Sequence, residues 1–230
     1  MTTFRWPALI AGLLALAALQ PSAAAAQISH PGFGKDERAP TGAPFALPPG
    51  LEIVGPIVGA DDDGNCPEPQ TKAVGTGLWV RVCVPVKNRT GGPVTVIFPP
   101  GLVIVSASEG FQNGLLVERQ VLTVPPIMPG PGRLKDKDED KDVIYIPIHT
   151  YCLNDGKEGS TPGKPYTLGP VSQHPAMAEF YRIMEGKDAR DHGERVEVVQ
   201  QALWDLIAEG GMNDQIREDL ARIDRIAPLK

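Results

Sequence analysis

The sequence contains few cysteines, no excess of positive charge and no long apolar run after its first 26 residues. Three cysteines in 230 residues is an odd number, so at most two can pair within the chain and one thiol needs another explanation. The formal net charge of −6 at pH 7 predicts no nucleic-acid partner, because such binding needs clustered Lys and Arg. The lack of a later apolar run predicts no membrane span in the mature chain.

Residues 1–26 have the order of a cleavable signal peptide. Arg5 supplies a short basic region, an apolar run covers 8–19, and small residues over 22–26 form an A-x-A type of cleavage site. The apolar run is shorter than the roughly 20 residues that a membrane-spanning helix needs. Cleavage near Gln27 would remove Arg5 and change the net charge from −6 to −7. We therefore expect a secreted protein, either periplasmic or extracellular.

The mature chain is long enough for a sizeable core, and its pattern divides it into three parts. Residues 27–48 mix Pro, Gly and charged residues without a helix or strand period, which predicts a loosely ordered N-terminal arm. Residues 49–155 contain short period-two segments separated by Gly/Pro turns, the clearest of which is 76–86. Further strand-like segments cover 93–98, 102–106, 114–124 and 143–153. This pattern predicts an antiparallel β-sandwich or open barrel.

Residues 156–230 predict a small helical subdomain that packs on the β domain. After a polar loop over 154–165, apolar residues recur at helical spacing from Pro175 onward. Two more helices are expected over about 194–208 and about 213–223, and Gly210-Gly211 would stop the first of these. The fold class is thus mainly β, with a C-terminal helical part.

Two acidic segments of the sequence are candidate calcium-binding turns. Acidic residues alternate with lysines over 135–142, which would offset the charge of a calcium loop, and a solvated hairpin tip is the favoured interpretation. Asp61, Asp62, Asp63 and Asn65 meet at a second turn, where an ion is somewhat better favoured. The sequence leaves open whether either turn binds calcium.

Two short segments carry a family resemblance. Tyr151-Cys152-Leu153 and the run Val199-Gln200-Gln201-Ala202-Leu203-Trp204 resemble the two signature motifs of bacterial surface thioester domains. In that family the Cys sulfur is bonded to the side-chain carbonyl of the Gln, with loss of ammonia. The resemblance implies a thioester between Cys152 and Gln200, supported by Tyr151, Ala202 and Trp204. Position 199 departs from the family pattern, which has Thr there.

The resemblance also implies a function. An amine on a partner protein or small molecule would attack the thioester carbonyl, giving an amide and freeing the thiol, as in adhesion at a bacterial cell surface. Such a protein turns over once and is not an enzyme, and no cofactor is implied. Trp204 lies one helical turn after Gln200 and could keep water from the bond. A disulfide between Cys66 and Cys83 would leave Cys152 unpaired for the thioester.

Two other functions remain open at this stage. In the first, the protein is a non-covalent structural or binding module of the cell envelope, and Cys152 is a small buried apolar residue. In the second it is a hydrolase, with His149, His174 or His192 beside a Ser or a carboxylate. No G-x-S-x-G or H-E-x-x-H motif supports the hydrolase. His149 lies three residues before Cys152 in a predicted strand, so the two side chains should face opposite sides.

Overall fold

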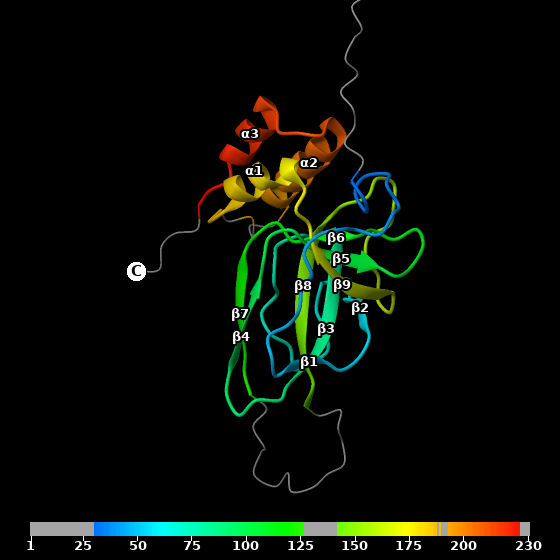
Figure 1. Ribbon diagram of the computed structural model, residues 1–230, viewed down its shortest axis with the longest axis vertical. Helices are drawn as coiled ribbons and strands as arrows, with labels where there is room; N and C mark the ends of the chain where they lie inside the picture. Colours follow the sequence, from blue (N-terminus) through cyan, green and yellow to red (C-terminus); the bar gives the residue numbers. More distant parts are fainter. Residues whose placement is uncertain (1–29, 127–141, 188, 190–192, 226–230) are drawn as a thin grey trace, which may run out of the picture.

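The computed structural model describes residues 30–126, 142–187, 189 and 193–225. The predicted signal peptide and most of the acidic run over 135–142 lie outside the described residues. The chain forms nine strands and then three helices (Figure 1): β1 (Leu51–Ile53), β2 (Ile57–Gly59), β3 (Val80–Asn88), β4 (Val94–Phe98), β5 (Leu102–Ser106), β6 (Gly114–Leu115), β7 (Gln120–Val124), β8 (Ile144–Cys152), β9 (Pro165–Val171), α1 (Pro175–Met184), α2 (Glu194–Glu209) and α3 (Asp214–Ala221). The prediction of a mainly β chain with a C-terminal helical part is confirmed.

Six of the strands form an antiparallel barrel with extra strands attached. Going around the ring, β3 pairs with β8, β8 with β6, β6 with β5, β5 with β9, β9 with β2, and β2 again with β3. The additional strand β1 pairs with β3, while β4 and β7 form a separate two-stranded sheet. Each neighbour in the ring satisfies its partner's backbone hydrogen bonds, which leaves few open sheet edges.

The two longest strands supply much of the barrel core. Valines at alternate positions of β3 are buried, and they share one apolar cluster with the isoleucines of β8, as period two requires: Val80, Val82, Val84, Val86, Ile144, Ile146 and Ile148. The β3–β8 ladder runs from Val86↔Ile144 to Val80↔Thr150. Cys152, at the end of β8, therefore lies just beyond the last residue pair of this ladder.

The three helices lie together at one end of the β domain (Figure 1), where they bury the apolar residues of α1, α2 and α3 in a second cluster. Their ends follow ordinary capping chemistry. Asn213 caps α3 by accepting a hydrogen bond from the Ile216 N–H at 2.7 Å, and Gly210 ends α2 with a φ of 72° that favours glycine. No helix within the described part of the chain is both long and apolar enough to cross a membrane.

Three features differ from the sequence-based expectations. The described part of the N-terminal arm is not loose, because Phe33 is buried in the helical cluster and the Gly34 N–H donates to the Leu153 carbonyl at 2.7 Å. The segment 114–124 is two strands rather than one, since β6 pairs within the barrel and β7 pairs with β4. Finally, β9 lies within the segment 156–230 assigned to the helical subdomain and belongs to the barrel instead.

The Cys66–Cys83 disulfide predicted from the sequence is confirmed, and it ties the loop before β3 to that strand. The two cysteines are separated by 17 positions, so replacing both by Ala should lower the free energy of unfolding by about 3 kcal/mol through the loss of a closed loop. Urea denaturation of the double variant and the oxidised wild type measures this difference. An unchanged midpoint and slope would contradict the prediction.

Candidate functional site

Cys152 lies at the boundary between the barrel core and the helices. It is 3% exposed and packs in the barrel cluster, whereas its neighbours Tyr151 and Leu153 pack in the cluster formed with the helices. This alternation is the period of a strand. Cys152 is the free cysteine of the chain, and burial raises the pKa of its thiol to about 12. The thiol is therefore protonated at neutral pH.

Gln200 is the buried polar residue of α2, and it reaches the backbone of Cys152. The Cys152 N–H donates to Gln200 Oε1 at 2.8 Å, and Gln200 Nε2 donates to the Cys152 carbonyl at 3.0 Å. On its other side β8 pairs with β6, and the Leu153 N–H donates to the Asn113 carbonyl. The Gln200 carboxamide thus occupies the edge of β8 that β3 has left, and it satisfies both backbone groups there.

The structure places the Gln200 carboxamide against the backbone of Cys152, while the Cys152 side chain packs in the barrel cluster. The two hydrogen bonds hold the carboxamide against the residue that bears the thiol, and both side chains are nearly inaccessible to solvent. The Cys152 N–H also points at Gln200 Oε1, the atom on which negative charge would develop if sulfur attacked the carboxamide carbon. Backbone donors aimed at such an oxygen are a common means of stabilising acyl-transfer transition states.

Tyr151 is anchored by a chain of buried polar groups that the sequence did not reveal. Its hydroxyl lies 2.8 Å from Thr76 Oγ1, and the Thr76 hydroxyl also donates to Glu118 Oε1. Glu118 is buried, and this burial raises the pKa of its carboxyl from 4.5 to about 7. Tyr151 therefore supports the site from beneath the helices, through contacts made by segments far away in the sequence.

The raised pKa of Glu118 predicts how stability depends on pH. The folded protein keeps the Glu118 proton to higher pH than the unfolded chain does, so the free energy of unfolding should fall as pH rises from 4.5 to about 7. This rise in the Glu118 pKa corresponds to a loss of about 3 kcal/mol in the free energy of unfolding. Urea denaturation at pH 5 and pH 8 should show that Glu118→Gln removes this part of the decline. The exposed Glu109→Gln serves as the control, and equal declines in the two variants would contradict the prediction.

Tyr166 and Tyr151 are both buried, and the environments of their hydroxyl groups can be compared. Tyr166 is 3% exposed in the barrel cluster that contains Cys152, and among the described residues its hydroxyl has no hydrogen-bond partner. Ser106, its register partner on β5, lies near this hydroxyl and donates its own proton to the Ser108 carbonyl.

Removing an unsatisfied hydroxyl should be harmless, whereas removing a bonded one should be costly. We expect Tyr166→Phe to leave the free energy of unfolding unchanged or raise it by up to about 1 kcal/mol, and Tyr151→Phe to lower it by about 1 kcal/mol. Chemical denaturation of both variants compares the two effects. The reverse order would show that Tyr166 has a partner in solution.

Ala202 and Trp204, the other residues of the second motif, have different environments. Ala202 is 3% exposed in the helical cluster. Trp204 is 40% exposed, and it does not cover Cys152 and Gln200 as expected. The Trp204 ring lies one turn along α2 from Gln200, at the edge of the interface between the helices and the barrel. The apolar residues of α2 and the barrel core exclude water from the pair instead.

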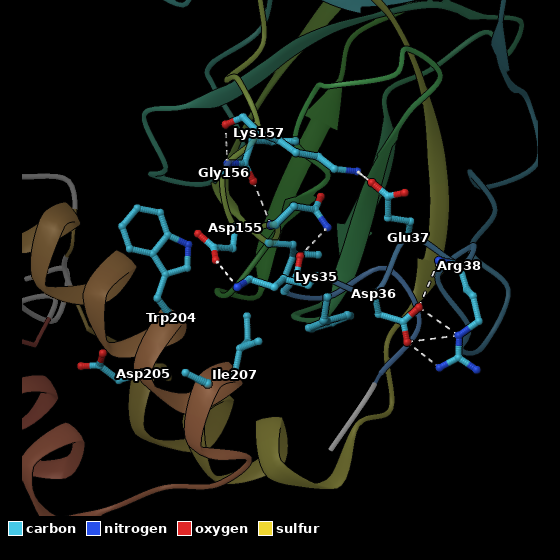
Figure 2. Close-up of a pocket in the computed structure, with 16 residues that line it drawn as sticks. Lys35, Asp36, Glu37, Arg38, Asp155, Gly156, Lys157, Trp204, Asp205 and Ile207 are labelled. Carbon is cyan, nitrogen blue, oxygen red and sulfur yellow. Dashed lines mark hydrogen bonds and ion pairs between the residues drawn. The ribbon is translucent and has the colours of Figure 1, made fainter. Parts of the chain in front are cut away.

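Trp204 borders a groove of about 1150 Å³ between α2, the loop after β8 and the N-terminal arm (Figure 2). Leu153 and Asn154, which directly follow Cys152, also line it. Figure 2 shows Trp204 beside Asp155, and the pair Lys157 Nζ–Glu37 Oε1 (3.3 Å) farther along the groove. The groove thus passes next to Cys152 and Gln200 without either residue lining it.

No protein-family model, curated protein or solved structure matches this chain.

The histidines do not assemble a hydrolase site in the described residues. The His149 ring lies 2.9 Å from the Gly64 carbonyl, on the face of β8 away from Cys152. His174 caps α1 by accepting from the Ala176 N–H at 3.2 Å, and His192 lies outside the described residues. A pair not predicted from the sequence, His30 Nε2 and Ser172 Oγ at 3.2 Å, adjoins a cavity of only about 10 Å³, which is too small for a substrate.

In the acidic turn at 61–65, the Asp61 side chain forms hydrogen bonds with backbone groups of the same turn. Asp61 Oδ1 accepts from the backbone N–H groups of Asp63 and Asn65, at 3.0 and 2.7 Å. This is the pattern of an Asx turn. Across the described ranges, no group of three or more His, Cys, Asp or Glu residues is arranged to hold a metal ion.

Proposed function

We propose that this protein is a secreted thioester protein, in which Cys152 and Gln200 form an internal bond that captures an amine. The observation that carries the proposal is the double hydrogen bond between the Gln200 carboxamide and the backbone of Cys152, at 2.8 and 3.0 Å. It holds the electrophilic carbon next to the nucleophilic residue on two rigid elements, a strand end and a mid-helix position. Such placement lowers the entropic part of the barrier to reaction.

The bond would form without a cofactor. The Cys152 sulfur attacks Gln200 Cδ while the Cys152 N–H stabilises the oxygen, and the C–N bond then breaks. The thiol proton leaves with the nitrogen as ammonia, so the products are one thioester and one ammonia. Burial disfavours the free thiolate, as the raised pKa of Cys152 indicates, so the proton is transferred as the new bond forms.

In the capture reaction the Cys152 sulfur would be the leaving group, whereas in thioester formation it is the nucleophile. An amine attacks Gln200 Cδ, the C–S bond breaks, and the amine proton passes to sulfur, which leaves an amide and a free thiol. The groove beside Trp204 gives a partner access to the residues next to the bond. Since the thiol is not regenerated as a thioester, each molecule reacts once, as in covalent adhesion to an amine-bearing protein or small molecule.

Methylamine tests the capture step. Incubated with wild-type protein, it should raise the intact mass by about 31 Da over the thioester form and release one alkylatable thiol per chain. Cys152→Ala should show neither change. Uptake of methylamine by Cys152→Ala, or no uptake by the wild type after prolonged incubation under native conditions, would contradict the proposal.

A second candidate function is a non-covalent structural or binding module of the cell envelope. The same two hydrogen bonds favour it, because they satisfy the Cys152 N–H and carbonyl, which a buried strand end would otherwise leave without partners. In that case Gln200 closes the end of the β8 ladder and Cys152 fills space in the barrel. The protein would then keep its full sequence mass apart from the disulfide hydrogens.

A further inference from the structure

The N-terminal arm crosses the end of the barrel next to the candidate site. Phe33 anchors it in the helical cluster, where the side chain is 4% exposed. The Gly34 N–H donates to the Leu153 carbonyl at 2.7 Å, and the Asp155 N–H donates to the Gly34 carbonyl at 3.2 Å. Leu153 directly follows Cys152 in the chain. The arm therefore covers the backbone beside the candidate site, whether or not a thioester forms.

Two histidines pack against each other where the arm meets the start of α1. The His30 ring lies edge-on to the His174 ring, with 4.5 Å between the ring centroids, and edge-on to Phe33 at 4.6 Å. His30 Nε2 lies 3.2 Å from Ser172 Oγ, and His174 Nδ1 accepts a hydrogen bond from the Ala176 N–H at 3.2 Å. The cavity that both rings line has a volume of about 10 Å³, which is at the lower limit for one water molecule. A charge on the inner side of either ring therefore has no room for hydrating water.

The surroundings of the two rings favour their neutral form. Burial lowers the pKa of both histidines below 6.5, and the neighbouring His174 lowers the pKa of His30 further. On the arm itself, Asp36 raises the pKa of His30 and Arg38 lowers it, and these two residues form an ion pair with each other. The residues that α1 and α2 contribute to the small cavity carry no charge: Ala176, Met177, Leu206 and Ile207. Both rings are therefore mainly neutral at pH 7.

Protonation would disrupt this arrangement in two ways. A charged imidazole carries an N–H on both nitrogens, so His174 could no longer accept the hydrogen bond that caps α1. Two charged rings would also repel each other at a centroid distance of 4.5 Å. We propose that His30 and His174 form a pH-sensitive clasp, which holds the arm closed at neutral pH and opens it in mild acid. The stabilisation by this clasp is complete above pH 6.5, and it is lost as pH falls through the lowered pKa values of the two rings.

Hydrogen exchange of the Gly34 amide measures whether the arm opens. Its protection factor, which corrects for the intrinsic pH dependence of exchange, is compared by NMR at about pH 7.5 and about pH 5.5 on the purified mature protein. We expect protection at Gly34 to fall by at least about tenfold at the lower pH, because a total shift of one pKa unit over the two rings changes the equilibrium tenfold. Amides of the β3–β8 ladder should keep their protection. No fall at Gly34, or an equal fall in the ladder, would overturn the proposal.

Variants without the titrating rings test whether the histidines cause the opening. His30→Gln keeps an amide that can contact Ser172, and His174→Asn keeps a side-chain oxygen that can cap α1. Combined, they should hold the Gly34 protection factor constant to within about threefold between the two pH values.

A histidine elsewhere in the fold supplies the control. His149→Gln removes a ring that contacts the Gly64 carbonyl, and this variant should retain the wild-type fall in protection at Gly34. An equal fall in the double variant and the wild type would contradict the clasp. If circular dichroism shows that the double variant does not fold, His30→Gln alone decides, because it removes the repulsion between the rings. A fall as large as that of the wild type would then count against the proposal.

Discussion

Replacing Gln200 by Ala is expected to lower the free energy of unfolding by about 2–5 kcal/mol relative to a chain in which the Gln200 carboxamide is intact. The Gln200 carboxamide is the partner of both the N–H and the carbonyl of Cys152, in a place that water does not reach. Each backbone group left without a partner costs about 1–3 kcal/mol. The truncated side chain would also leave a small cavity between α2 and the barrel, which adds to the loss.

The adjacent glutamine is a matched control for this variant. Gln201 is exposed and contacts Asp205 on the same helix, with Nε2 at 2.8 Å from Asp205 Oδ1. Gln201→Ala should change the free energy of unfolding by less than about 0.5 kcal/mol. Urea denaturation of the two variants measures the difference. Similar midpoints for Gln200→Ala and Gln201→Ala would show that the hydrogen bonds to Cys152 do not contribute to stability.

Thiol labelling in denaturant is expected to give zero thiols per chain for the wild type and one for Gln200→Ala. Cys66 and Cys83 are joined in a disulfide, so Cys152 is the cysteine that can react with a maleimide. A thioester blocks it even when the chain unfolds, whereas a buried free thiol becomes accessible. Labelling at slightly acidic pH limits hydrolysis of the bond during the experiment.

Further variants separate thioester formation from simple burial. Gln200→Glu should also give one thiol, because a carboxylate cannot expel ammonia, and Gln201→Ala should give zero, like the wild type. Cys152→Ala gives zero in every case and sets the background. One labelled thiol in the wild type would contradict the thioester while leaving the structural function of Gln200 intact.

Much of the fold follows from residue periodicity. The valines of β3 and the isoleucines of β8 alternate with other residues, and this pattern predicts two strands that share a core. The helix α1 begins at Pro175 as predicted, and α2 and α3 begin and end within about two residues of their predicted limits, since the Pro at 175 and the Gly at 210 are strong local signals. The sequence close to each of these elements is enough to predict it.

The elements missed from the sequence are those that depend on tertiary contacts. The strand β9 contains Pro165, Gly169 and Pro170, residues that ordinarily break strands, and it exists because β2 and β5 supply partners on both sides. The strands β1 and β2 have three residues each, too few for a recognisable period. Local patterns could not predict these three strands.

The candidate site was predicted only in part. The motif resemblance singled out Cys152 and Gln200, which are 48 positions apart, and the structure places them in contact through the Cys152 backbone. The environment of Trp204 was not predicted, because four residues along a helix fix a face but not the edge of an interface. The carboxyl of Glu118 gave no sequence signal, since its burial depends on how the helices pack on the barrel.

The thioester between Cys152 and Gln200 is tested most directly by the intact mass of the purified mature protein under non-reducing conditions. With the bond formed, the mass should lie about 17 Da below that of the sequence with one disulfide, the deficit of one ammonia, and Cys152→Ala should show no deficit. Gln201→Ala should retain the deficit. A wild-type chain at the full mass would contradict the thioester and leave Gln200 as the structural partner of the Cys152 backbone.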